Sequence, residues 1–285
     1  MGRRGGAGLA CGPVSTRLRA IAAANADIAA TGAYTTPEGV EVVVGPALEA
    51  ALAGTVSHAP GDPVEPPAPR PGVRTTFEVT PEGSLQAARR LHLDGAGHIA
   101  VLNFASARNP GGGYLGGAKA QEEDLCRHSL LYFCLLRAPD YYAAHRASPD
   151  LLYSHRVIWS PGVPVHRGNG GGLVADPFPV SFLTSPAPNA GEVLRRDPGR
   201  REEIRRALHE RAGRVLGVAA RHGARRLVLG AWGCGVFRND PREVAAAFHE
   251  HLTGAYATAF DQVVFAVWDR AKESANRAAF TERVA

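Results

Sequence analysis

A glycine triplet and an acidic cluster stand close together in the middle of the chain. They are Gly111, Gly112 and Gly113, followed eight residues later by Gln121, Glu122 and Glu123. Glycines without side chains let a ligand approach the backbone where any Cβ would clash. A carboxylate placed beside such a ligand can donate or remove a proton. The pattern favours cleavage of a glycosidic bond next to phosphates.

The two glutamates are neighbours at what reads as the start of a helix. Adjacent helical residues point about 100° apart. Glu122 and Glu123 are therefore not expected to flank one bond as the carboxylates of ordinary glycosidases do, ~5 to 9 Å apart. We expect one of them to transfer the proton and the other to position substrate hydroxyls. The alternative is a solvated first helical turn, where acidic residues are favoured by the helix dipole.

A second glycine-rich loop, GAWGCGVFRNDP, runs from Gly230 to Pro241 between a predicted strand and a predicted helix. Backbone N–H groups in such a loop, with the helix N-terminus after Asp240, predict an anion-binding site. The loop lacks the G-K-S/T of a P-loop, which argues against an ATPase. Phe237 could pack against a ribose or simply fill the core. Cys234 is expected to be a small buried residue, because no base is identifiable beside it.

Three further side chains stand where predicted strands end. Asn103 and Asn109 flank the first loop, and Trp268 closes the last strand. The asparagines are candidates for substrate contact, with turn formation as the alternative. Trp268 could stack on a purine or pack in the core. A second glycine triplet, residues 170–172, has no acidic sequel and is read as a flexible loop.

Strand and helix patterns alternate along the chain. The predicted strands cover residues 40–44, 75–79, 98–104, 157–159, 180–183, 225–231 and 262–268. The predicted helices cover residues 15–30, a short stretch ending at 52, and residues 84–91, 121–136, 202–222 and 241–252. This alternation predicts an α/β sheet with helices on both faces. Both glycine loops follow strands, so we expect them at one edge of the sheet, where such folds bind ligands.

Composition bounds the class of protein. The 285 residues suit one large domain or a domain with an extension. The proline-rich stretch 59–72 is expected to divide an N-terminal extension (residues 1–72) from a main domain (residues 73–285).

No run is apolar enough to span a membrane, and the N-terminus lacks the apolar region of a secretory signal. Four dispersed cysteines favour free thiols in the cytoplasm. The 11 histidines show no metal-ligand spacing, so no metal or cofactor is expected. The net charge of +5 permits anionic substrates without requiring nucleic acid.

The combination of GGG with QEE, the upstream NFAS strand end and the downstream GCGVF loop resembles the bacterial-type poly(ADP-ribose) glycohydrolases of the macrodomain superfamily. The resemblance extends over about residues 73–268. It implies a three-layer α/β/α macrodomain with a mixed central sheet and an ADP-ribose cleft, preceded here by a mainly helical N-terminal extension. It also implies hydrolysis of ribose–ribose bonds in poly(ADP-ribose), mainly from chain ends, with release of ADP-ribose and without a membrane partner.

The resemblance implies a role for each site residue. Glu123 would be the general acid and then the base, Glu122 would hold the ribose hydroxyls, and Gln121 would support the loop. Phe237 would orient the terminal ribose and Trp268 would neighbour the adenine. The implied diphosphate-binding residues are Gly233, Cys234, Gly235 and Val236.

Two other functions fit the glycine loops. One is a macrodomain hydrolase acting on mono-ADP-ribosyl esters, and the other is a non-catalytic ADP-ribose-binding module. The acidic cluster favours the polymer hydrolase, because a binding module needs no buried acid at this position.

Overall fold

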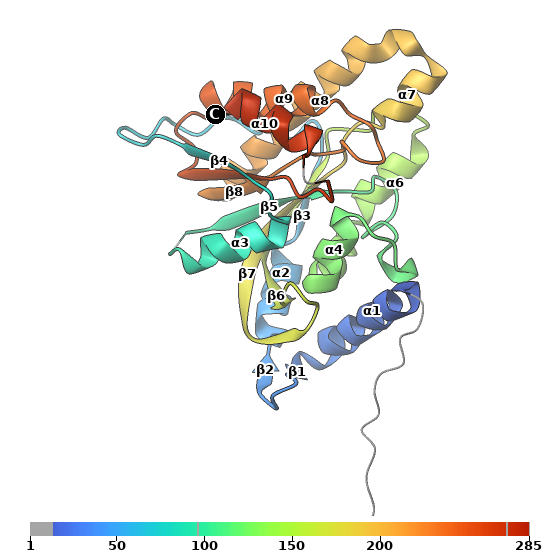
Figure 1. Ribbon diagram of the computed structural model, residues 1–285, viewed down its shortest axis with the longest axis vertical. Helices are drawn as coiled ribbons and strands as arrows, with labels where there is room; N and C mark the ends of the chain where they lie inside the picture. Colours follow the sequence, from blue (N-terminus) through green and yellow to red (C-terminus); the bar gives the residue numbers. More distant parts are fainter. Residues whose placement is uncertain (1–13, 96, 272, 285) are drawn as a thin grey trace, which may run out of the picture.

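The computed structural model describes residues 14–95, 97–271 and 273–284 (Figure 1). The prediction about a secretory signal concerns the N-terminus, and the first 13 residues, with one of the four cysteines, lie outside this part of the chain. Among the helices that are described, none is long and apolar enough to cross a membrane.

The centre of the fold is a seven-stranded sheet in the order β3-β6-β7-β5-β8-β9-β4. Its strands are β3 (Val56–His58), β4 (Thr76–Thr80), β5 (Ile99–Phe104), β6 (Val157–Arg167), β7 (Leu173–Ser185), β8 (Arg226–Leu229) and β9 (Gln262–Ala266). The strands β3, β6 and β7 pair antiparallel, whereas β7, β5, β8, β9 and β4 pair parallel. The predicted mixed sheet is confirmed.

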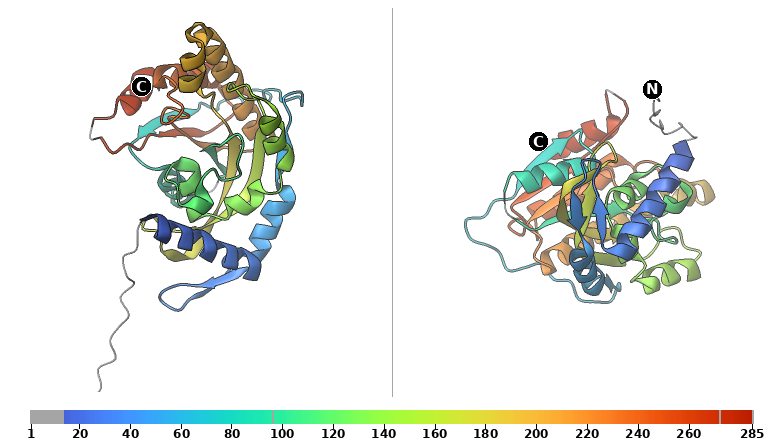
Figure 2. Two further views of the ribbon diagram at one scale, coloured as in Figure 1. Left: turned by 90° about the vertical axis from the view of Figure 1, so that its right-hand side faces the viewer. Right: turned by 90° about the horizontal axis from the view of Figure 1, so that it is seen from below.

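Helices cover both faces of this sheet, as predicted (Figures 1 and 2). One face packs against α7 (Ala190–Arg196), α8 (Arg201–Arg221), α9 (Pro241–Thr253) and α10 (Ala275–Val284). The other packs against α2 (Gly45–Gly54), α3 (Ser84–Leu93), α4 (Gln121–His128), α5 (Leu131–Leu135) and α6 (Pro139–Ala147). The central strand β5 reads IAVLNF and is buried from Ile99 to Asn103, because a parallel strand covered on both faces is apolar throughout.

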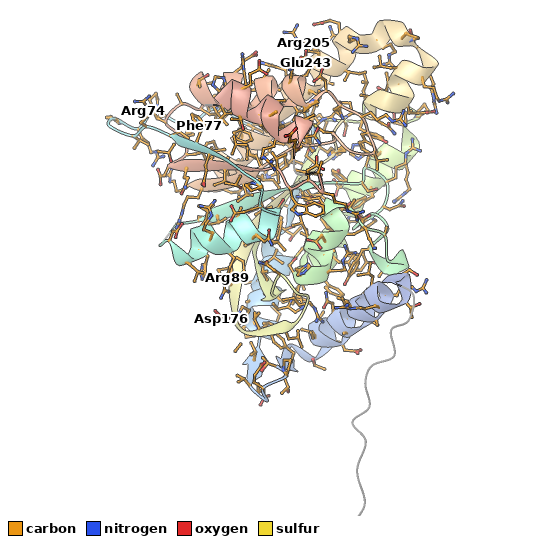
Figure 3. The ribbon with its side chains drawn as sticks, in the orientation of Figure 1. Arg74, Phe77, Arg89, Asp176, Arg205 and Glu243 are labelled. Atoms are coloured by element: carbon orange, nitrogen blue, oxygen red, sulfur yellow. The ribbon has the colours of Figure 1, made fainter. Side chains whose placement is uncertain are left out.

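Ion pairs at the surface connect neighbouring elements (Figure 3). Arg205 of α8 pairs with Glu243 of α9 at 3.2 Å, and Arg89 of α3 pairs with Asp176 of β7. Exposed pairs of this kind contribute little to the free energy of folding. The fold is therefore held mainly by the two apolar cores on either side of the sheet.

The N-terminal segment begins with α1 (Val14–Thr31), followed by β1 (Ala33–Thr35) and β2 (Glu41–Val43), which form a separate two-stranded sheet. The proline-rich stretch is irregular as expected, but it is tied down: Arg214 donates to the carbonyl of Asp62 and Arg221 to that of Pro63. The edge strand β3 precedes residue 72 and pairs with β6. The division at residue 72 stays a prediction about domain organisation, and the central sheet crosses it.

The predicted helix over residues 121–136 is wrong in one respect, because it is two helices. α4 ends at His128 and α5 begins at Leu131. Between them Ser129 bridges to Val165, and the Leu130 N–H donates to the Pro164 carbonyl at 3.1 Å. A tertiary contact with strand β6 thus replaces the helical hydrogen bonds that local propensity favours.

The two predicted short strands are parts of one long hairpin, β6–β7. Prolines 161, 164 and 179 interrupt the strand pattern in the sequence. Pro161 lies where the register shifts between Ser160 and Val163, whereas Pro164 and Pro179 stand opposite one another in the ladder. The second glycine triplet forms the turn of this hairpin, where Gly171 has φ +80° and the Gly168 N–H donates to the Gly172 carbonyl. It is an ordered hairpin turn rather than the expected loop. The sequence reasoning also missed β1, β3, α6, α7 and α10.

Candidate active site

The two glycine loops lie at the same edge of the sheet. The strands β5, β8 and β9 run parallel, so their carboxyl ends meet at this edge. The first loop follows β5, the second follows β8, and Trp268 follows β9. Gly230, directly after β8, lies close to the ends of β5 and β9. A Cβ added there would be 3.1 Å from the Phe104 ring and 2.6 Å from the Ala266 carbonyl oxygen. The expectation of a shared edge is confirmed.

Gln121 attaches the start of α4 to the sheet. Its side-chain oxygen accepts from the Phe104 N–H at 2.9 Å, and its amide nitrogen donates to the Leu102 carbonyl at 2.8 Å. The same nitrogen donates to the Ser84 hydroxyl at 3.1 Å. All these partners belong to β5 or α3, so Gln121 fixes the helix that carries the two glutamates.

The Glu122 carboxyl is almost completely buried, with 2% of the residue exposed. One oxygen accepts from Asn103 Nδ2 at 3.1 Å and the other from the Ser106 N–H at 2.7 Å. Burial raises the pKa of Glu122 to about 8, and the nearby Glu123 carboxylate adds to the increase. The hydrogen bonds from Ser106 and Asn103 oppose it, because they favour the charged form. Glu122 therefore carries a proton at neutral pH in the free protein.

The raised pKa of Glu122 predicts a pH-dependent stability. Between the ordinary value of 4.5 and about 8, the folded protein keeps a proton that the unfolded chain releases. The free energy of unfolding consequently falls as pH rises through this window. Glu122→Gln removes this loss. We therefore expect the Tm of the variant minus the Tm of the unmodified protein to be roughly 5 °C larger at about pH 9 than at about pH 5. Circular-dichroism melting of both proteins across the range measures this, and a Tm difference independent of pH would contradict it.

Glu123 is 7% exposed, and backbone N–H groups hold both of its carboxylate oxygens. Oε1 accepts from the Gly113 N–H at 2.8 Å, and Oε2 accepts from the Ala120 N–H at 3.0 Å. The second bond is the returning half of a capping box, in which the third helical residue satisfies the N-cap N–H. A carboxylate oxygen has two lone pairs, so each oxygen can still bind a substrate group.

The two carboxylates converge on Gly112. This residue has φ +58°, and an added Cβ would lie 2.5 Å from Glu123 Oε1 and 3.1 Å from Glu122 Oε2. Neighbouring helical side chains point in different directions, but both carboxylates reach this glycine because the loop backbone folds over the start of α4. Here glycine is required by the protein's own carboxylates.

The rest of the first loop is built by close packing. An added Cβ at Gly111 would lie 2.9 Å from the Tyr132 ring, and one at Gly113 would lie 2.6 Å from Ala118 Cβ. Asn103 is fully buried beside Glu122, whereas Asn109 is exposed and its carbonyl accepts from the Gly112 N–H at 3.0 Å. The structure thus brings Asn103 into the acidic cluster and gives Asn109 a role in the turn.

The second loop presents backbone donors. Its fold depends on Asn239, whose Nδ2 donates to the carbonyls of Pro188 and Gly233 at 2.8 and 3.1 Å. The N–H groups of Gly235, Val236 and Phe237 make no hydrogen bond to any residue that the structure describes. They remain available to an anion. The N-terminus of α9 differs from expectation, because the Asp240 carboxylate caps it by accepting from the Arg242 N–H at 2.9 Å.

The side chains of the second loop differ in exposure. Burial raises the pKa of the Cys234 thiol to about 12, which is unsuited to a nucleophile at neutral pH. Val236 is 85% exposed and Trp268 62% exposed, and both stand at the same sheet edge. Phe237 is half-buried, with its ring centroid 6.0 Å from that of Tyr153.

Sequence reasoning missed several residues of this site. The Ser106 N–H donates to Glu122, and the Thr184 hydroxyl accepts from Asn103. A backbone contact leaves no signal in the residue type, and hydroxyl residues at strand ends are too common to give one. Tyr153 has φ +59° and Arg238 has φ +56°, and among the described residues they are the two non-glycines with positive φ. Tyr153 packs against Phe237 and Arg238 follows it in the chain. Backbone strain thus concentrates around Phe237, which is typical of functional sites.

The fold and the site together define a macrodomain-type hydrolase with a buried acidic pair beside an anion-binding loop. The family model "Microbial-type PARG, catalytic domain" matches residues 22–168. The crystal structure of poly(ADP-ribose) glycohydrolase (PARG) from Thermomonospora curvata is similar at 46% identity and TM-score 0.87, covering 94% of this chain and 99% of that one. The same glycohydrolase bound to the inhibitor ADP-HPD gives a TM-score of 0.86.

The Deinococcus radiodurans PARG in complex with ADP-ribose is 46% identical at TM-score 0.78, over 84% of this chain and 97% of that one. A comparison with curated protein sequences gives no match. The chain belongs to the microbial-type poly(ADP-ribose) glycohydrolase family, and it is accordingly an enzyme of the glycoside hydrolase class.

Proposed function

We propose that this protein hydrolyses the ribose–ribose O-glycosidic bonds of poly(ADP-ribose), mainly from chain ends, and releases ADP-ribose. The observation that carries the proposal is the convergence of two buried carboxylates on Gly112. A loop with free backbone N–H groups stands at the same sheet edge and suits a diphosphate. The relatives in complex with ADP-ribose and with ADP-HPD support this substrate class.

Glu123 is the proposed proton donor. Cleavage of a ribose–ribose bond passes through an oxocarbenium-like state, which requires protonation of the leaving oxygen. In our proposal the substrate complex carries a proton on Glu123, which passes it to the leaving oxygen as the glycosidic C–O bond breaks. As carboxylate, Glu123 then takes a proton from the water whose oxygen bonds to the anomeric carbon. The Gly113 and Ala120 N–H groups keep the carboxyl in place through both steps. Fixed positioning of this kind removes the entropic cost of aligning the reacting groups.

Glu122 and the second loop are proposed to hold the substrate. A protonated Glu122 can donate its O–H to a ribose hydroxyl while its oxygens keep the bonds from Asn103 and Ser106. The N–H groups of Gly235 to Phe237 would bind the diphosphate, whose negative charge also stabilises the oxocarbenium-like state.

Cys126, Cys134 and Cys234 are free thiols, which supports the proposal that the protein works in the cytoplasm.

Product identification tests the reaction. The protein is incubated with labelled poly(ADP-ribose) and, separately, with a mono-ADP-ribosylated protein, and the products are separated by chromatography. We expect monomeric ADP-ribose and gradually shortened chains from the polymer, whereas internal cleavage would release free oligomers early in the reaction. Release from the mono-modified protein alone would favour an ester hydrolase. Binding of ADP-ribose without any product would leave a non-catalytic binding module.

Phe237→Ala tests the proposed orientation of the terminal ribose. Phe237 is fixed by contact with Tyr153 and by the hydrogen bond from the Gly191 N–H to its own carbonyl. We expect kcat to fall by roughly 10- to 100-fold, because a misplaced sugar loses alignment with the acid. The affinity for ADP-ribose, measured by calorimetry, should fall by less than about threefold. Equal losses in both quantities would make Phe237 a simple binding contact, and Phe237→Leu controls for lost apolar volume.

A further inference from the structure

Helix α1 lies against the catalytic elements although it is far from them in sequence (Figure 1). Gly117, in the turn after the glycine triplet, has φ +80°, and an added Cβ would lie 2.8 Å from the Ser15 carbonyl oxygen and 3.4 Å from Leu18 Cβ. The loop that carries Gly111 to Gly113 therefore rests directly on the first turns of α1. This contact raises the question of what α1 contributes to the site.

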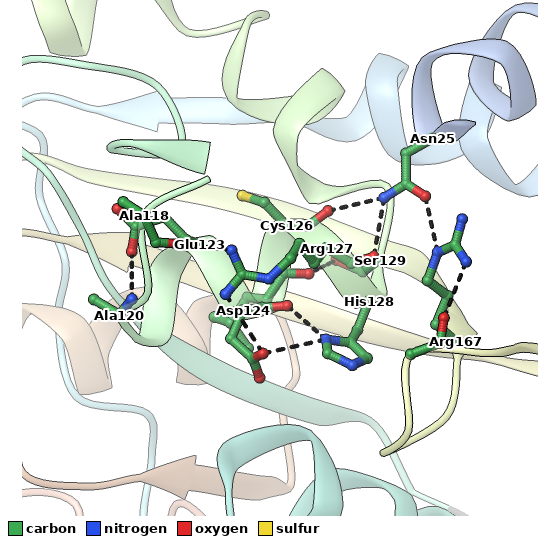
Figure 4. A network of polar contacts seen from close by, with 12 residues as sticks. Asn25, Ala118, Ala120, Glu123, Asp124, Cys126, Arg127, His128, Ser129 and Arg167 are labelled. Carbon is green, nitrogen blue, oxygen red and sulfur yellow. Dashed lines mark hydrogen bonds and ion pairs between the residues drawn. The ribbon is translucent and has the colours of Figure 1, made fainter. Parts of the chain in front are cut away.

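Asn25 of α1 is fully buried and reaches the last turn of α4 (Figure 4). Its Nδ2 donates to the Arg127 carbonyl at 3.0 Å and to the Cys126 carbonyl at 3.2 Å. These carbonyls belong to the last turn of α4, where no helical N–H is available to them. Asn25 thus supplies, from another helix, the partners that the end of the catalytic helix lacks.

The same amide also contacts the glycine loop. Nδ2 lies 3.2 Å from the hydroxyl of Tyr114, the residue that follows the triplet. Arg127 strengthens this connection, since its side chain donates to the Ala118 carbonyl at 2.7 Å. The end of α4 and the loop are therefore fastened to one another and to the single side chain of Asn25.

The oxygen of Asn25 fixes which way its amide points. Oδ1 accepts from Arg167 Nε at 3.0 Å and lies 3.0 Å from His166 Nε2. Arg167 Nε can only donate, so the Asn25 atom that faces it is the oxygen. Burial lowers the pKa of His166 to about 3, and the neutral ring donates to this oxygen in the tautomer with its hydrogen on Nε2. With two donors facing its oxygen, the Asn25 amide cannot flip without breaking these bonds. Its NH₂ group is therefore committed to α4 and the loop.

α4 is only eight residues long, about 12 Å, and its first turn carries both glutamates. A shift of its last turn consequently moves the acidic pair relative to Gly112. Displacements of about 1 Å at a reacting centre can cost 100-fold in rate. We propose that Asn25 is a positioning residue for catalysis: it holds α4 and the glycine loop together so that Glu122 and Glu123 converge over Gly112. This inference rests on the proposed function and gives α1 a role in it.

The test compares kcat, ADP-ribose affinity and Tm for three variants, with labelled poly(ADP-ribose) as substrate. Asn25→Asp keeps the size of the side chain but directs a carboxylate at the α4 carbonyls. We expect kcat to fall at least about 10-fold while ADP-ribose affinity stays within about threefold. Thr75→Val is the matched control, because Thr75 is also buried and donates to two carbonyls, of Ala257 and Phe260, at the far edge of the sheet. It should lower Tm comparably and leave kcat within about twofold.

Tyr114→Phe provides a milder variant that fills the same space and removes only the hydroxyl. We expect it to lower kcat about threefold or more, and to have little further effect in the Asn25→Asp protein, because the two changes break one connection. Two results would overturn the proposal. One is an unchanged kcat in Tyr114→Phe. The other is an equal loss of kcat in Asn25→Asp and Thr75→Val when the two variants have the same Tm. An inactive unmodified protein would instead refute the proposed function, so the two failures are distinguishable.

Discussion

Glu123→Gln is expected to lower kcat for poly(ADP-ribose) by at least about 100-fold, the usual scale for loss of a general acid. Glutamine preserves the volume and can still accept from the Gly113 N–H through its oxygen, but it can neither give up a proton nor accept one from water. Because the nucleotide is proposed to bind at the second loop, ADP-ribose affinity should stay within about threefold. Steady-state kinetics on labelled polymer and calorimetry with ADP-ribose measure the two effects.

Asp124→Asn is the matched control for this variant. Asp124 is the next carboxylate of the same helix, but its side chain is 56% exposed and lies 3.7 Å from the buried Arg127 guanidinium. We expect the kcat of this variant within about twofold of the unmodified protein, since a largely solvated carboxylate at this distance contributes little. Full activity in Glu123→Gln would remove Glu123 from the mechanism.

Gly112→Ala is expected to abolish most activity although it replaces no ionisable side chain. The added methyl carbon would lie 2.5 Å from Glu123 Oε1 and 3.1 Å from Glu122 Oε2, so one or both carboxylates must move. Displacing the acid by about 1 Å predicts a loss of about 100-fold in kcat. The positive φ of +58° adds strain for alanine, which we expect to cost about 1 to 3 kcal/mol of stability.

Gly116→Ala separates this steric effect from a general intolerance of the loop. Gly116 lies in the same loop, but nothing lies within 4 Å of an added Cβ, and its φ is not in the positive range. Activity and Tm should remain near those of the unmodified protein. If Gly112→Ala also retained its activity, the convergence of the carboxylates on this glycine would not matter for the reaction.

The fold class could be predicted from the sequence because its signals are local. Continuous apolar runs such as IAVLNF predict buried strands, and the helical spacing of Leu85, Ala88 and Leu91 predicts α3. Chain order then places the two glycine loops at strand ends, and hence at one edge of the sheet. The residue types of the site were also evident, since triple glycine followed by paired glutamates is a rare combination.

Features that depend on distant partners were not evident. The break at Ser129 is imposed by β6, and the length of the β6–β7 hairpin is decided by pairing that overrides its prolines. Asn25 gave one weak signal, a polar residue in line with the buried Ala22 and Ile28 of α1. Its partners lie about 100 residues away in the chain, so no local pattern could name them.

The sequence by itself determined which residues are candidates for the chemistry and that their loops follow parallel strands, because residue type and hydrophobic period are properties of short segments. Only the tertiary structure decided that both carboxylates meet over Gly112, that the Asp240 carboxylate caps α9, and that Asn25 of α1 bonds to the end of α4. These arrangements depend on hydrogen bonds and close contacts between segments far apart in the chain. Their energies are set by burial and geometry, which exist only once the chain is folded.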